Sequence, residues 1–190
     1  MTTQTTPPGP TRQDAPGDID FVSPHGEPDT LAHYAGPLLV IQLVRYFGCL
    51  PCREYLEGLD ARSPELEVLG ARALAIGGSA DYQARWLLER GVRMPLLLDP
   101  EQRFREWVGM GDLSSRQLMS VAGMRSYASA VRNGYRLQKP TQDRKKSPGV
   151  VVLSEELELL WTHEGKAMGD YPPLDDLIAT VTELAAGQGA

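Results

Sequence analysis

Phe47-Gly48-Cys49-Leu50-Pro51-Cys52-Arg53 is the stretch that decides the fold of this chain. It contains the only two cysteines of the 190 residues and places them in a C-x-x-C pair. The apolar run 38–44 precedes it and is rich enough in β-branched residues to predict a buried strand. A helical pattern follows, because Cys52, Leu56 and Leu59 recur at i, i+4 and i+7. The stretch therefore predicts a strand that delivers a cysteine to the start of a helix.

A cysteine at the start of a helix has altered acid chemistry. The unpaired N–H groups and the helix dipole favour the thiolate, so they lower a thiol pKa from its usual value of about 8.5. We expect Cys49 to feel this effect, and we expect Cys52 to lie close enough to attack Cys49 once that sulfur is oxidised. Arg45 and Arg53 flank the pair and are candidates to stabilise a thiolate or bind a substrate; the alternative is that both are solvated.

Other interpretations of a C-x-x-C pair fit less well. Structural zinc normally takes four ligands, whereas the chain offers two cysteines and three scattered histidines, His25, His33 and His163. A c-type haem attachment requires a histidine directly after the second cysteine, and Arg53 stands there. An inert pair of buried core cysteines remains as the alternative to a redox pair, and the helix-start position favours the redox pair.

Length and composition indicate one folded domain. Residues 1–18 are rich in Thr, Pro, Gly and Asp, which predicts a disordered tail ahead of a domain at 19–186, with 187–190 as a C-terminal tail. The sequence contains no apolar run of 18 residues and no secretory signal pattern. We therefore expect a cytoplasmic protein that does not bind a membrane, in which the pair rests reduced.

The net charge of −6 is unevenly distributed. The basic segment, residues 116–146, contains eight basic residues and one acidic residue, Asp143, a balance of +7. One interpretation is a docking surface for an anion or an acidic partner. The other is a solvated insertion. Nucleic acid is not expected as a ligand, because the segment has only two aromatic residues, Tyr127 and Tyr135, and no nucleic-acid module.

Apolar runs alternate with helical patterns along the chain. The expected strands are 38–44, 73–76, 95–98, 147–153 and 157–163, with a short edge strand in 21–28. The expected helices follow the C-x-x-C pair and cover 80–90, 101–108 and 174–184, with further helical stretches at 114–124 and 125–133. Ser79 is placed to cap the 80–90 helix, with Tyr82 facing inward. This order predicts an α/β fold with a central mixed sheet flanked by helices, interrupted at 111–147 by a helical insertion.

The assembled order resembles the thioredoxin-like fold, and more closely the peroxiredoxin branch, the alkyl hydroperoxide reductase and thiol-specific antioxidant family. The likeness spans roughly residues 19–186. It is carried by the order of several short motifs: Gly36-Pro37, Gly48-Cys49, Ala75-Ile76-Gly77-Gly78-Ser79, Leu96-Leu97-Leu98-Asp99-Pro100 and Gly169-Asp170-Tyr171-Pro172-Pro173.

This resemblance implies roles for particular residues. Cys49 would be the peroxidatic or attacking cysteine and Cys52 the resolving one. Pro148 would match the cis-proline that thioredoxin-like proteins place against the active-site disulfide. In the family signature P-x-x-x-T-x-x-C, the threonine position is held here by Tyr46, which still offers a hydroxyl. The family arginine before the strand near residue 149 is absent, and Lys146 is the neighbouring candidate to contact substrate or partner.

The resemblance predicts a thiol-dependent oxidoreductase with an antioxidant role that reduces peroxides or disulfides. A small thiol or a thioredoxin-like protein would reduce the Cys49–Cys52 disulfide again, with no metal or organic cofactor. Two alternatives stay open: a disulfide reductase without useful peroxidase activity, and a binding module that acts through the basic segment. A homodimeric assembly also stays open.

Overall fold

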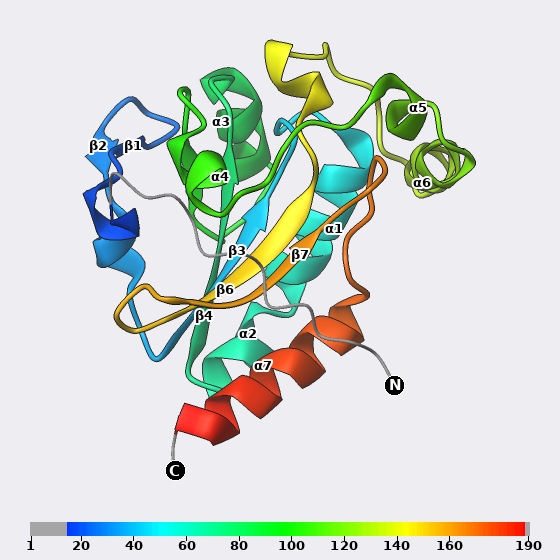
Figure 1. Cartoon of the computed structure of the whole chain (residues 1–190). Helices are drawn as coiled ribbons and strands as arrows, with labels where there is room; N and C mark the ends of the chain where they lie inside the picture. Colours follow the sequence, from blue (N-terminus) through cyan, green and yellow to red (C-terminus); the bar gives the residue numbers. More distant parts are fainter. Residues whose placement is uncertain (1–14, 189–190) are drawn as a thin grey trace.

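A mixed seven-stranded sheet forms the centre of the computed structural model, which describes residues 15–188 (Figure 1). The strands follow the order β2-β1-β5-β4-β3-β6-β7 across the sheet. Their bounds are β1 Phe21–Val22, β2 Pro28–Asp29, β3 Leu38–Leu43, β4 Ala71–Gly77, β5 Leu96–Leu98, β6 Gly149–Ser154 and β7 Leu159–Glu164.

The centre of the sheet is parallel and its flanks are antiparallel. Strands β3, β4 and β5 run in parallel, and β6 pairs with β3 in the antiparallel sense, with Leu43 opposite Gly149. All six residues of β3 are buried, since helices cover both faces, which is why this strand is a continuous apolar run rather than an alternating one. The β6–β7 hairpin confirms the predicted turn at residues 155–156.

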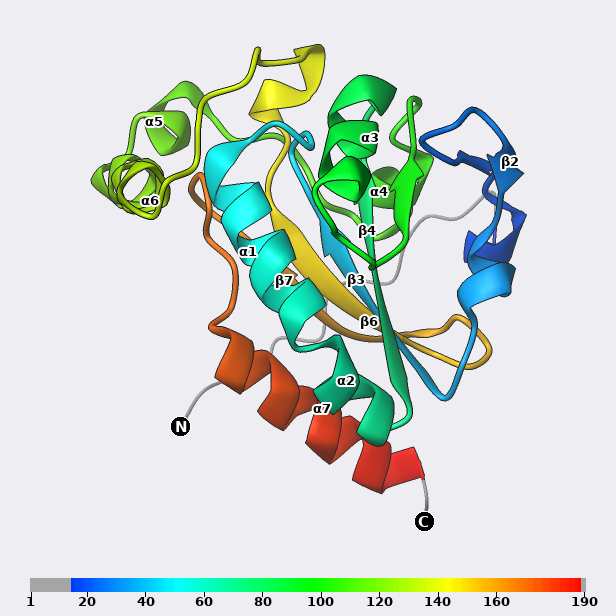
Figure 2. The ribbon, with the colours of Figure 1, turned by 180° about the vertical axis from the view of Figure 1, so that it is seen from behind.

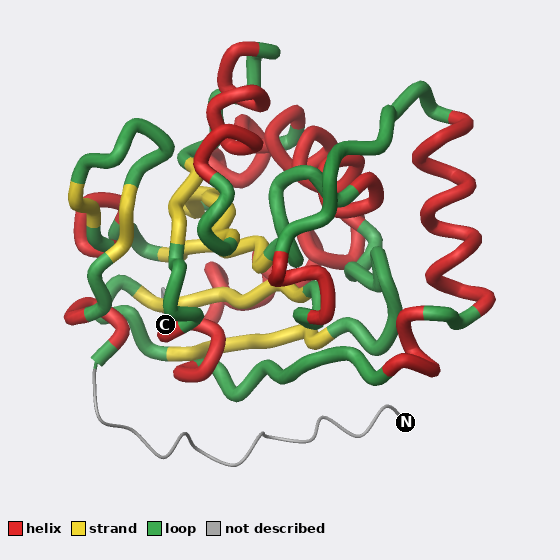
Figure 3. Tube along the Cα trace, turned by 90° about the horizontal axis from the view of Figure 1, so that it is seen from above, coloured by secondary structure: helices red, strands yellow, loops and turns green. Residues whose placement is uncertain are grey.

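Helices pack on both faces of the sheet (Figures 1 and 3). One core cluster joins even-numbered β3 residues to buried residues of α1, α2, α3 and α7, and a second joins odd-numbered β3 residues to α4 and the N-terminal segment. The bounds are α1 Leu50–Ala61, α2 Ser63–Val68, α3 Asp81–Glu89, α4 Arg103–Trp107, α5 Ser115–Leu118, α6 Val121–Arg132 and α7 Leu174–Gln188, with 3-10 turns η1 Pro16–Asp18, η2 Leu31–Tyr34 and η3 Gln142–Lys145. The predicted α/β architecture is confirmed.

The chain between α4 and β6 leaves the sheet, as the sequence predicted for the insertion at 111–147. It contains α5, α6 and η3, and Figure 2 shows α5 and α6 beside the N-terminal end of α1. Its two ends lie side by side, because Asp112 and Lys146 form an isolated antiparallel bridge. Ser120 caps α6 by accepting a hydrogen bond from the Gly123 N–H at 3.1 Å.

Three local expectations need correction. The N-cap of α3 is Ala80 rather than Ser79, and Tyr82 is 51% exposed because the helix starts at Asp81 and turns that side chain outward. Part of the expected N-terminal tail is structured, since residues 16–18 form η1 with Pro16 buried; residues 1–14 lie outside the described residues. At the other end α7 continues past the predicted boundary at 186.

Among residues 15–188, none of the helices combines the length and the apolar character that a membrane span requires.

Candidate active site

The C-x-x-C pair lies at the junction between β3 and α1, as the sequence predicted. Beyond the last residue of β3, the chain turns through residues 45–48, and the Cys49 N–H donates to the Tyr46 carbonyl at 3.0 Å. Cys49 then serves as the N-cap of α1 with extended backbone angles, and Cys52 follows within the first turn. Both sulfurs are free thiols, and both residues are 0% exposed.

Two polar groups from different parts of the chain contact the Cys49 sulfur. The Arg45 Nη1 lies 3.8 Å from Cys49 Sγ, and the Tyr127 hydroxyl of α6 donates to the same sulfur at 3.8 Å. The Tyr46 hydroxyl lies 3.5 Å from the Tyr127 hydroxyl, one step further from the sulfur. A cation and a hydroxyl donor beside a sulfur stabilise its anionic form and any negative charge that develops on an oxygen next to it.

Cys52 is held from the sheet side. The Gln42 side chain of β3 donates from Nε2 to the Cys52 carbonyl at 3.0 Å. Tyr171, in the loop before α7, donates its hydroxyl to the Leu43 carbonyl at 3.2 Å and stacks on Tyr55 with ring centroids 4.4 Å apart. These contacts fix the first turn of α1 against the end of β3.

The two thiols ionise as a pair. Burial opposes a charge on either sulfur, but the hydrogen bond from Cys49, the charge of Arg45 and the Tyr171 hydroxyl together lower the pKa of Cys52 to about 6. Burial and the hydrogen bond to Cys52 raise the pKa of Cys49 well above that of an ordinary thiol. The pair therefore holds one negative charge between its two sulfurs, and the thiolate expected at Cys49 stays a prediction.

The insertion covers this site instead of standing apart from it. Arg45 donates from Nη2 to the Arg144 carbonyl, and Arg53 donates from Nη2 to the Arg136 carbonyl. Together with Tyr127 on Cys49, these contacts tie three points of the insertion to the C-x-x-C pair and the arginines that flank it. Both cysteines beneath this cover are 0% exposed.

Gln83 joins the cover to the turn before Cys49. Its Oε1 accepts from the Gly48 N–H at 2.9 Å, and its Nε2 donates to the Lys139 carbonyl at 2.9 Å. A Cβ atom at Gly48 would lie 2.4 Å from Gln83 Nε2, so only glycine leaves room for this side chain. Gln83 is 0% exposed, and no local sequence pattern distinguishes it from the other residues of α3.

The other predicted site residues lie further from the sulfurs or make other contacts. Arg53 stacks over the Trp86 ring, with its Cζ 5.1 Å from the ring centroid. Lys146 forms an ion pair with Asp112 at 3.0 Å at the base of the insertion. The peptide bond before Pro148 is trans, so the match to a cis-proline is wrong; the Pro148 carbonyl accepts from the Gly165 N–H at 2.7 Å.

A buried arginine from another element occupies the place next to Pro148. Arg105 of α4 is 2% exposed and donates to the Ser147 carbonyl at 2.5 Å and to the Val44 carbonyl at 2.9 Å. It therefore ties the end of β3 to the start of β6. Arg105 and Tyr127 both lie more than 50 residues from the cysteines in sequence, and no local pattern marked either one as part of the site.

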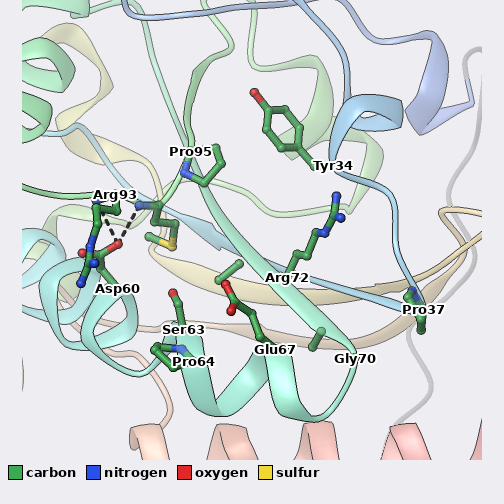
Figure 4. Close-up of a pocket in the computed structure, with 13 residues that line it drawn as sticks. Tyr34, Pro37, Asp60, Ser63, Pro64, Glu67, Gly70, Arg72, Arg93 and Pro95 are labelled. Atoms are coloured by element: carbon green, nitrogen blue, oxygen red, sulfur yellow. Dashed lines mark hydrogen bonds between the residues drawn. The ribbon is translucent and has the colours of Figure 1, made fainter.

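A hollow of about 750 Å³ lies at the end of the sheet opposite the cysteines, where β3 and β4 begin (Figure 4). Figure 4 shows Arg72, Glu67 and Asp60 on its walls, and Asp60 accepts from the backbone N–H groups of Arg93 at 3.1 Å and Met94 at 2.6 Å. These contacts join the end of α1 to the segment before β5. Within residues 15–188, no group of three or more His, Cys, Asp or Glu side chains is arranged to hold a metal ion.

No protein-family model matches the chain, and no curated protein matches it. Solved structures do. Peroxiredoxin Q of Xanthomonas campestris is similar with a TM-score of 0.62 and 16% identity over 90% of this chain and 93% of that chain. Peroxidoxin BcpB of Mycobacterium tuberculosis has a TM-score of 0.62 and 16% identity over 90% and 95%.

A chain assigned as the thiol:disulfide interchange protein DsbE of Chlorobium tepidum is also similar, with a TM-score of 0.56 and 15% identity over 94% of this chain and 99% of that chain. At such identities the likeness establishes the fold. It confirms the thioredoxin-like fold that the sequence predicted, in the form that peroxiredoxin-like proteins share.

Proposed function

We propose that this chain is a peroxiredoxin-like thiol oxidoreductase that cycles Cys49 and Cys52 between dithiol and disulfide. The observation that carries the proposal is the surroundings of Cys49: a guanidinium and a hydroxyl, each 3.8 Å from its sulfur, with a second thiol in the same helical turn. An inert pair of core cysteines needs neither a buried arginine nor a tyrosine hydroxyl at its sulfur. The structural likeness to peroxiredoxins supports the same conclusion.

The first step is the attack of Cys49 on a peroxide. Cys49 becomes the thiolate by passing its proton along the hydrogen bond to Cys52. Its sulfur then forms a bond to one peroxide oxygen while the O–O bond breaks, and the departing oxygen takes a proton and leaves as water or an alcohol. Arg45 and the Tyr127 hydroxyl are placed to stabilise the charge on that departing oxygen.

The second step resolves the oxidised sulfur. The Cys52 sulfur attacks the Cys49 sulfenic acid, an S–S bond forms, and water leaves. Two further electrons and two protons from an external thiol, or a thioredoxin-like protein, restore the dithiol and convert that reductant to its disulfide. Because both sulfurs are 0% exposed, the reductant gains access only when the insertion moves away from the C-x-x-C stretch.

Intact mass spectrometry tests this cycle. We expect one equivalent of hydrogen peroxide to remove two hydrogens from the protein mass, and we expect Cys52→Ser to stop instead at a gain of one oxygen on Cys49. Cys49→Ser should show neither change. An unchanged mass for the unsubstituted protein would refute the proposal.

A disulfide reductase without useful peroxidase activity is the second candidate, and the likeness to the DsbE chain favours it. The two candidates differ in the oxidant that reaches Cys49. A buried sulfur under Tyr127 is more accessible to a small peroxide than to a protein disulfide, so we expect peroxide turnover to exceed disulfide turnover with one common reductant. The opposite ranking would select the reductase.

The contacts of the insertion bear on the third candidate, a binding module independent of the cysteines. The same segment that carries the +7 balance supplies Tyr127 to Cys49 and two carbonyls to the flanking arginines. We therefore propose that the basic segment serves the thiol cycle.

A further inference from the structure

A hollow of about 690 Å³ lies between α1, α3 and the chain that follows α6. Its volume falls in the range of small-molecule sites, which is about 300–1,000 Å³. Three of its wall residues are arginines from three separate elements, Arg53, Arg90 and Arg136, and two are aromatic, Trp86 and Tyr135. Like-charged side chains repel, so their convergence on one hollow indicates an anionic ligand.

Arg53 forms the buried wall of this hollow. It is 2% exposed, donates from Nη2 to the Arg136 carbonyl, and stacks over the rings of Trp86 at 5.1 Å and Tyr135 at 5.7 Å. Its Nε has no hydrogen-bond partner among the described residues. A buried guanidinium N–H without a partner is costly, and a bound anion would satisfy it.

The acidic group in the hollow does not cancel this charge. Glu57 lines the hollow, and its carboxylate accepts a hydrogen bond from the Tyr135 hydroxyl at 2.7 Å. Arg90 and Arg136 are exposed, and Arg90 also lies over the Trp86 ring, 4.7 Å from the ring centroid. Three guanidinium groups therefore face one carboxylate, and the planar donor fork of arginine suits carboxylates in particular.

We propose that this hollow binds the carboxylate of a small reactant in the thiol cycle. The reactant is either a carboxylate-bearing thiol that reduces the Cys49–Cys52 disulfide or a carboxylate-bearing hydroperoxide that oxidises the dithiol. This inference rests on the proposed function, because Arg53 directly follows Cys52. The Arg53 N–H donates to the Cys49 carbonyl at 3.0 Å, so a ligand anchored on Arg53 lies beside the helical turn that carries both cysteines.

Binding is measured without chemistry, by following the Trp86 indole N–H signal in an NMR titration with succinate. We expect succinate to shift this signal and neutral butanediol to leave it unchanged. The double variant R90Q/R136Q should weaken succinate binding about tenfold or more. The control R116Q/R125Q removes the same charge from exposed positions of the basic segment outside the hollow, and it should bind as the unsubstituted protein does.

Turnover then identifies the reactant. Mercaptopropionate is compared with mercaptopropanol as reductant, and cumene hydroperoxide with its para-carboxylate as oxidant. We expect a lower KM for the anion in one of these pairs, and we expect R90Q/R136Q to abolish that difference. The pair that shows it identifies reductant or oxidant.

Some results would overturn the inference. No shift of the Trp86 signal with succinate, equal KM values within both pairs, or an equal loss of affinity in R116Q/R125Q would each contradict a carboxylate site in the hollow. A failure of the proposed function gives a different result from a failure of this inference. In that case succinate would still bind in the hollow, but the protein would turn over none of the thiols or hydroperoxides.

Discussion

Removal of the Arg45 charge should raise the pKa of the C-x-x-C pair. Arg45 Nη1 lies 3.8 Å from Cys49 Sγ, its charge also acts on Cys52, and both cysteines are 0% exposed. Two unit charges about 4 Å apart interact by about 4 kcal/mol at an effective dielectric constant of about 20, and by about 1 kcal/mol in bulk water. Since one pKa unit corresponds to about 1.36 kcal/mol, Arg45→Met should raise the first pKa of the pair by about 1–3 units, from about 6.

Thiolate absorbance near the ultraviolet edge measures this shift, because it does not require a reagent to reach the buried sulfurs. The unsubstituted protein should show a first midpoint near the pKa of about 6, so about nine tenths of the molecules should hold a thiolate at pH 7. In Arg45→Met the thiolate should become the minor form at that pH whenever the shift exceeds about one unit.

Tyr127→Phe is the matched control for this measurement. It removes the other donor at 3.8 Å from Cys49 but leaves the guanidinium charge in place. A hydrogen bond to a charged group contributes about 1.5–3 kcal/mol at ordinary length, and this one is long, so we expect a smaller shift of the pKa than in Arg45→Met. An Arg45→Met midpoint that stays near that of the unsubstituted protein, with thermal unfolding showing an intact fold, would refute the electrostatic role assigned to Arg45.

Three further predictions concern the pH dependence of the rate, the cover over the cysteines and the core beneath α1. The rate of peroxide consumption should rise with pH through a midpoint of about 6 and level off above it, because the lowered pKa of Cys52 makes the pair a thiolate only above that value; a rate still rising steeply between pH 8 and 9 would contradict the assignment. Gln83→Ala should speed alkylation of the cysteines by a bulky maleimide about tenfold or more, since it removes the link between Gly48 and Lys139; an unchanged alkylation rate would contradict this role of Gln83. Leu56→Ala should lower the free energy of unfolding by about 2–5 kcal/mol, because Leu56 is 0% exposed in the α1 core, as measured by urea denaturation; a loss below 1 kcal/mol would show that the core collapses around the cavity.

Local sequence patterns were sufficient for much of the architecture. The buried run 38–44 became β3, the Cys52, Leu56 and Leu59 spacing became the buried face of α1, and the turn at 155–156 became a hairpin. These predictions succeeded because strand and helix periodicities are properties of neighbouring residues. The position of Cys49 at the N-cap of α1 followed for the same reason.

Errors arose where a tertiary contact decides the outcome. Ser79 has a good capping side chain, but α3 begins two residues later, at Asp81. Pro148 stands at the expected place before β6, but its peptide bond is trans. Lys146 was chosen for its neighbourhood in sequence, and it pairs with Asp112 across the base of the insertion instead.

The sequence by itself determined that a C-x-x-C pair would sit at a strand-to-helix junction of an α/β fold, because adjacent residues set that geometry. Only the tertiary structure decided what surrounds the sulfurs. Tyr127 and Gln83 come from helices far along the chain, and the insertion folds back over α1 to bury both thiols. The ionisation of the pair also depends on this arrangement, since the charge of Arg45, the Tyr171 hydroxyl and burial act through space rather than along the chain.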